Sequence, residues 1–93
     1  MTKAHRPIRI DFHNADPEGF VRLNTVGCIE DLSVSGLILQ SGLRVEVTDG
    51  EIVVDGLVHP PGAEGVWRLQ VDWDEVFRRH AAAGVPQLSP QSN

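Results

Sequence analysis

The sequence contains no tyrosine and only one cysteine, one methionine and one lysine. The single cysteine, Cys28, has no internal disulfide partner, which excludes a disulfide-stabilised secreted scaffold. No apolar run approaches the roughly 20 residues that a membrane-spanning helix needs. The first nine residues, MTKAHRPIR, are charged and lack the apolar core of a signal peptide. The sequence therefore predicts a cytoplasmic protein without a membrane segment.

The chain has 93 residues, which is enough for one small domain. Valine, isoleucine, leucine and phenylalanine make up about 30% of it, above the level typical of disordered chains. Thirteen acidic and eight basic residues give a net charge of −5, which disfavours binding to bulk nucleic acid. A basic N-terminal arm nevertheless holds Lys3, Arg6 and Arg9 before the first acid, Asp11. This arm is compatible with a small phosphate-bearing ligand.

Apolar and polar residues alternate with a period of two in residues 8–12, 43–48 and 67–73. This alternation predicts strands with one buried and one exposed face. Residues 20–24 and 51–58 are also rich in β-forming residues but alternate less regularly. Because short strands with one apolar face must hide their edges, we predict closure of the sheet on itself. The expected fold is an all-β domain with one C-terminal helix, over residues 1–86. Its core is a small closed or partly open antiparallel β-barrel of about six strands.

Turn chemistry supports this prediction at two positions in the middle of the chain. Asp49-Gly50 is the strongest hairpin signal, because a type I′ turn needs positive φ at both central residues and Asp-Gly tolerates it. Gly56 lies inside the next strand segment and indicates a bulge or a sharp bend.

The C-terminal part changes to a helical period. Val76, Phe77 and His80 lie on one helical stripe. Asp72 and Glu75 have the spacing of a capping box, and Gly84 followed by Pro86 ends the pattern. We therefore predict a helix near residues 74–83, with Val76 and Phe77 closing one end of the barrel. Residues 87–93 are predicted to be a disordered tail.

Residues 26–36, VGCIEDLSVSG, are compatible with two structures. Residues 28–32 can continue a strand into a turn, or the same residues can form a short helix that ends at Gly36. Ser33, Val34 and Ser35 are mediocre helix formers, so we favour a strand followed by a turn.

The stretch DLSVSG, residues 31–36, fits the pattern D/N-x-S-x-x-G and resembles the hallmark of PilZ domains, small barrels that bind cyclic di-GMP. In that family an R-x-x-x-R pair lies twenty to thirty residues upstream. Arg6 and Arg9 lie 25 and 22 residues before Asp31, although R-P-I-R has two residues between the arginines instead of three. The resemblance implies a dinucleotide site in which the arginines hold phosphates and stack on guanine. Its residues would be Arg6, Arg9, Asp31, Ser33 and Gly36.

Residues 14–25 also resemble segments of short bacterial proteins of unknown function. This resemblance implies no activity. If it is the closer relation, Asp31 and Ser33 belong to a short helix and hold no ligand.

Other candidate residues give no chemical site in the sequence. Asp11, His13 and Asp16 form a carboxylate–imidazole cluster, but a solvated strand face followed by a turn explains them better than a metal site. Cys28 lacks an identifiable base and fits a small core residue. Trp67 and Trp73 fit one buried face of a strand. We therefore expect no catalytic residues, no metal and no cofactor.

Two functional hypotheses follow from these observations. The first is a non-enzymatic β-barrel module that binds another protein through an exposed strand edge or through the Pro-Pro-Gly loop at residues 60–62. The alternative is a PilZ-like receptor for cyclic di-GMP. The local structure separates them, because a helix over residues 28–34 would not form the turn that the dinucleotide site requires.

Overall fold

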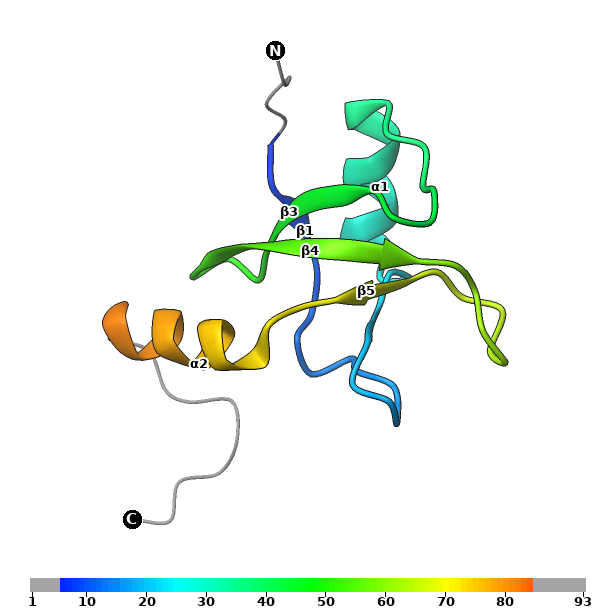
Figure 1. The fold of residues 1–93 in the computed structure, drawn as a ribbon. Coiled ribbons are helices and arrows are strands. Elements are labelled where there is room, and N and C mark those ends of the chain that lie inside the picture. Colours follow the sequence, from blue (N-terminus) through cyan, green and yellow to red (C-terminus); the bar gives the residue numbers. More distant parts are fainter. Residues whose placement is uncertain (1–5, 85–93) are drawn as a thin grey trace.

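A computed structural model describes residues 6–84 of the chain and contains five strands and two helices (Figure 1). The elements follow the chain in the order β1 (Ile8–Arg9), β2 (Val21–Arg22), α1 (Val26–Ser35), β3 (Arg44–Thr48), β4 (Val53–His59), β5 (Arg68–Gln70) and α2 (Trp73–Ala82). The predicted tail at residues 87–93 lies outside the described residues.

The strands form one curled sheet in the order β1-β3-β4-β5-β2. β1 pairs with β3 in parallel, and the other three pairs are antiparallel. The molecule is thus a half-barrel, which agrees with the partly open barrel that we predicted, whereas a closed barrel, six strands and fully antiparallel pairing are wrong. β1 and β2 have two residues each, occupy the two outer positions of the sheet and do not pair with each other. Their outward N–H groups bind Asp31 and Asn14 instead.

The predicted alternation describes the burial correctly. Val45 and Val47 of β3 point into the core and the residue between them is exposed, and in β4 the buried positions are Val54, Gly56 and Val58. The core is completed by residues from the N-terminal segment, α1, β5 and α2, namely Ile8, Ile10, Phe12, Val21, Leu23, Cys28, Ile52, Leu69, Val71 and Val76.

The β3–β4 hairpin is present, but its turn is not type I′. Four residues, 49–52, connect the strands, and Gly50 alone among them has a positive φ, at 102°. The Asp49 carboxylate accepts hydrogen bonds from the backbone N–H groups of Glu51 (2.9 Å) and Ile52 (3.2 Å). This side-chain capping supports a longer turn in which only the glycine needs a left-handed conformation.

Residues 26–35 are helical, so the preference for a strand followed by a turn is wrong. The Thr25 hydroxyl caps the start of α1 by accepting a hydrogen bond from the Cys28 N–H at 3.2 Å. Gly36, at φ 70°, ends the helix, and the Leu37 N–H bonds back to the Leu32 carbonyl at 3.2 Å. These two caps satisfy backbone groups at both ends of a helix whose last three residues are mediocre helix formers.

The predicted C-terminal helix is present as α2. The Asp72 carboxylate accepts from the N–H groups of Asp74 and Glu75, as the capping pattern predicted. Trp73 is the first helical residue, so β5 ends at Gln70 and the two tryptophans do not share a strand. Val76 and His80 are buried, and His80 Nε2 lies 2.8 Å from Asp49 Oδ2 in the β3–β4 turn.

Gly56 lies in regular register opposite Val45, so the predicted bulge is not present. Its glycine is required for a different reason. A methyl group at this position would lie 2.5 Å from both Cγ and Cδ2 of Leu69, closer than side-chain carbons approach one another. Leu69, which is fully buried, therefore packs directly on the bare backbone of β4.

Candidate functional site

Three of the five residues predicted to bind a ligand lie together. Arg6, Arg9 and Asp31 line a hollow of about 300 Å³, together with Pro7, Val34 and Ser35. Ser33 and Gly36 do not line it, because α1 carries Ser33 as an exposed helical residue and Gly36 serves as its C-cap. The sequence motif is thus divided between the side and the end of a helix.

Arg9 and Asp31 bind each other rather than leaving a vacant phosphate site. Asp31 Oδ2 accepts from the Arg9 backbone N–H and from Nε, and Oδ1 accepts from Nη2, all at 2.9 Å. These hydrogen bonds from Arg9 lower the pKa of Asp31 to about 2. Since the backbone N–H of Arg9 points away from β3, Asp31 also closes the outer edge of β1.

The outer edge of β2 is closed by the chain that precedes it. The Arg22 N–H donates to the Asn14 carbonyl (2.9 Å), and the Asp16 N–H donates to the Phe20 carbonyl (2.8 Å). The Asp16 carboxylate accepts in turn from the Glu18 and Phe20 N–H groups, at 2.9 and 3.0 Å. Each outer strand of the sheet therefore has an outward backbone N–H, that of Arg9 or Arg22, bound within the same chain.

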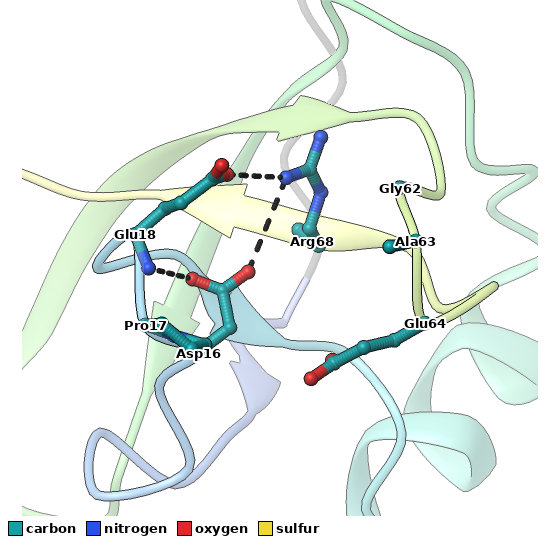
Figure 2. A pocket seen from close by; sticks show the side chains of 7 residues that line it. All are labelled: Asp16, Pro17, Glu18, Gly62, Ala63, Glu64 and Arg68. Atoms are coloured by element: carbon teal, nitrogen blue, oxygen red, sulfur yellow. Dashed lines mark hydrogen bonds and ion pairs between the residues drawn. The ribbon is translucent and has the colours of Figure 1, made fainter.

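A hollow of about 470 Å³ lies between this turn and the loop at residues 62–64 (Figure 2). Arg68 crosses its floor and lies 3.1 Å from Glu18 Oε1 and 4.0 Å from Asp16 Oδ2. The same guanidinium stacks over the Phe20 ring at 4.6 Å. Arg22 holds the opposite wall through two 2.8 Å bonds to Glu64. The charged groups of this hollow are therefore engaged with one another and hold two loops together.

The N-terminal half of β4 has an open edge. β5 pairs with β4 only from Leu57 to His59, and the chain then leaves the sheet to begin α2. Val58 exchanges backbone hydrogen bonds on the β3 side, with Gly42 and Leu43. Because bonding direction alternates along a strand, Val53 and Asp55 direct their N–H and C=O groups to the other side. Within residues 6–84, no strand pairs with Val53 or Asp55 on that side.

A groove runs along this open edge, between β4 and α2. Three adjoining hollows of about 510, 210 and 440 Å³ form it, and neighbouring hollows share Asp55 and Glu75 or Val53 and Arg79. Figure 1 shows α2 continuing onward from the end of β5, so that the helix lies beside the first half of β4. We call this feature the β4–α2 groove; its polar and charged lining residues include Arg44, Glu46, Glu51, Asp55, Gln70, Asp72, Glu75 and Arg79.

The charge of the β4–α2 groove is predominantly acidic, with five carboxylates and two arginines. Glu46 and Asp55 stand directly opposite each other in the β3–β4 register. Their position is a non-hydrogen-bonded pair, where side chains lie closest, and like charges there are destabilising. Arg79 is bound to Glu75 at 2.8 Å. In the described part of the chain, neither Glu46 nor Asp55 has a hydrogen-bond or ion-pair partner through its carboxylate.

The helix cap at Asp72 indicated this groove in the sequence, but the prediction of a strand over residues 67–73 concealed it. Asp72 is the N-cap of α2, so the helix begins at Trp73 and the preceding strand cannot include that residue. The predicted strand over residues 67–73 is longer than the observed β5, and a strand of that length could pair along more of β4. The short β5 and the acidic side chains of β4 together define the open edge.

The remaining candidate residues, Cys28, His13 and Asp11, lie in environments that are explained by the fold. Cys28 is fully buried, and desolvation raises the pKa of its thiol to about 11, which disfavours the reactive thiolate. His13 lies 3.5 Å from Asp11 in an exposed pair. Across residues 6–84, no group of three or more potential ligands is placed to hold a metal ion. Neither described helix is long and apolar enough to cross a membrane.

Comparisons with family models, with curated proteins and with solved structures find no match to this chain.

Proposed function

We propose that this protein is a non-enzymatic interaction module that binds another protein by adding an extended segment of that partner to the open edge of β4. The observation that carries the proposal is the unpaired stretch at Val53 and Asp55, beside a groove walled by α2. Strand addition supplies affinity through main-chain hydrogen bonds, and neighbouring side chains then select the sequence.

The other edges of the sheet support this choice of surface. Asp31 binds the outward backbone N–H of β1, and the turn at residues 14–16 pairs with the outer side of β2. An incoming strand would have to displace those bonds. At Val53 and Asp55 it would break no such bond, because within residues 6–84 these backbone groups have no partner on the side away from β3.

A proline substitution tests the proposal at the backbone. Asp55→Pro removes an N–H that points into the groove and leaves the β3 ladder, which uses Val54 and Gly56, without a lost donor. We expect at least about tenfold weaker binding of an eight-residue peptide of alternating valine and threonine, since one edge hydrogen bond and its neighbours are lost. Asp55→Asn is the matched control, because it keeps the donor and also removes the charge. Fluorescence anisotropy gives the affinities, and circular dichroism verifies that each variant is folded.

The wild-type protein provides a readout that does not depend on a variant. On addition of the same peptide, the amide NMR signals of Val53 and Asp55 are expected to shift and to become protected from hydrogen exchange. Shifts confined to other residues, or equal binding by Asp55→Pro and Asp55→Asn, would exclude this edge as the binding surface.

Binding of cyclic di-GMP is the second proposal. The hollow around Arg6, Arg9 and Asp31 supports it, whereas the helix over residues 26–35, which does not form the turn expected of a dinucleotide site, counts against it. A dinucleotide there would have to take Arg9 away from Asp31, and residues 31–35 would act from a helix. Calorimetric titration at low salt, with Arg9→Ala as the control, tests it directly. No heat at tens of micromolar ligand, or equal heat from both proteins, would remove this proposal.

A further inference from the structure

We infer that the segment bound along β4 is basic, with lysine or arginine at alternate positions. This inference rests on the proposed function, because it concerns what the open edge selects. The side chains of Glu46 and Asp55 emerge on the outer face of the sheet, and Asp72 and Glu75 of α2 stand on the other wall of the β4–α2 groove.

The direct opposition of Glu46 and Asp55 is the first reason for this choice. Two carboxylates in a non-hydrogen-bonded cross-strand pair repel each other in the free protein. Nearby Arg79 is already bound to Glu75. A cation on the added strand would face Asp55 directly, with Glu46 one strand further away. It would offset the repulsion between the two acids, and relief of that repulsion would add to the binding free energy.

The strand period fixes where those cations must be. Successive side chains of an added strand point to opposite faces, so every second residue reaches the outer face that carries Glu46 and Asp55. Facing residues on neighbouring strands lie about 4.5–5.5 Å apart, within reach of a lysine or arginine side chain. An acidic segment in the same register would bring further carboxylates against this pair.

Three eight-residue peptides test the inference with the full-length protein: alternating valine–lysine, valine–threonine and valine–glutamate. We expect the lysine peptide to bind at least about tenfold more tightly than the threonine peptide at low salt, and the glutamate peptide to bind most weakly. The preference should shrink as salt is raised, because the pairs are near the surface. Fluorescence anisotropy gives the affinities, and amide shifts at Val53 and Asp55 locate the binding.

The double variant Glu46→Gln/Asp55→Asn separates the acid pair from the general charge of the chain. It keeps every edge backbone group and should abolish most of the preference for lysine over threonine. Asp11→Asn/Glu30→Gln removes two carboxylates that do not line the groove, and it should retain the preference. Circular dichroism confirms folding of both variants.

The outcomes distinguish this inference from the proposed function. If all three peptides bind equally and shift the amide signals of Val53 and Asp55, the edge binds strands, but the inferred preference for basic segments is wrong. If the two double variants lose the preference equally, the selectivity comes from net charge and the inference is again wrong. If no peptide shifts Val53 or Asp55, the proposed function fails and the inference fails with it.

Discussion

The outer edges of the sheet and the inner edge at β4 differ in whether their backbone N–H groups are bound within the described residues. At β1, a carboxylate from α1 binds the outward N–H of Arg9, and at β2 the turn at residues 14–16 completes the hydrogen bonding. At β4 the neighbouring strand stops after three residues and leaves Val53 and Asp55 beside a groove.

The difference shows that an open edge need not lie at the end of a sheet. A free edge promotes unwanted pairing, and proteins commonly blunt it with charge or cover it. Here the terminal strands are covered and the inner stretch is charged. A charged edge discourages pairing with neutral or acidic chains but admits a strand of opposite charge. The covered outer edges therefore exclude a basic partner strand, whereas the charged inner edge admits one.

The largest expected effect comes from Gly56, where β4 passes from its paired half to its open half. In Gly56→Ala, the added methyl group meets Leu69 at 2.5 Å. We expect the free energy of unfolding to fall by about 1–3 kcal/mol, the usual cost of overpacking. Urea denaturation measures it. In a Leu69→Ala background the same substitution should cost little, because the space is vacated. Strictly additive costs would show that the contact with Leu69 is not the cause.

Removing the closure of the β2 edge should have the next largest effect. Asp16→Ala deletes the acceptor for the N–H groups of Glu18 and Phe20 and one neighbour of Arg68. We expect a loss of about 1–2 kcal/mol in the free energy of unfolding, typical of hydrogen bonds to a charged group. Asp16→Asn keeps one acceptor oxygen and should recover part of the loss. Equal losses in the two variants would contradict a role for the hydrogen bonds.

A smaller effect is expected at β1. Asp31→Ala exposes the Arg9 N–H to water and leaves its guanidinium paired with Glu30. The Arg9 amide should exchange with solvent about tenfold faster, the equivalent of one lost hydrogen bond. Native-state hydrogen exchange followed by NMR measures this, with the Val47 amide as an internal reference. In the wild type, the Arg9 amide should be more protected than those of Val53 and Asp55. The reverse order would overturn the contrast between the edges.

The smallest effect is the pH dependence of the same closure. Arg9 lowers the pKa of Asp31 to about 2 from an ordinary 3.8. The stabilisation is therefore complete above the ordinary pKa and is lost as the pH falls through about 4 toward 2. Because both groups lie near the surface, the change is modest. The difference in unfolding free energy between wild type and Asp31→Asn should narrow over that interval. A difference that stays constant from pH 6 to 2 would contradict it.

The sequence predicted which residues face the core better than it predicted which strands are neighbours. Alternation is a local property, and it placed Val45, Val47 and Leu69 in the interior correctly. The parallel pairing of β1 with β3 depends on packing across about 39 residues of chain, which no local pattern encodes. The prediction of antiparallel closure therefore had no direct support in the residues.

The helix α1 was the alternative that the sequence left open but did not favour, and its apolar residues do not form one stripe. Cys28 is buried, but Val26 and Val34 are 72% and 82% exposed. An amphipathic pattern is therefore absent, and of the two caps only Gly36 was identified from the sequence, whereas the Thr25 cap was not. Arg9 and Asp31 were placed together correctly by the resemblance to a ligand site. The sequence did not indicate that they bind each other.

The pairing of β2 with β5 has a consequence for how the chain assembles. Val21 lies opposite Leu69, so β2 can pair only after β5, about 48 residues further along the chain, has been synthesised. The hairpin of β3 and β4 is local, whereas both borders require closure of long loops, which slows folding. During synthesis, we expect the first third of the chain to leave the ribosome before either border can form. The hairpin would then be the template on which β1, and finally β5 with β2, are laid.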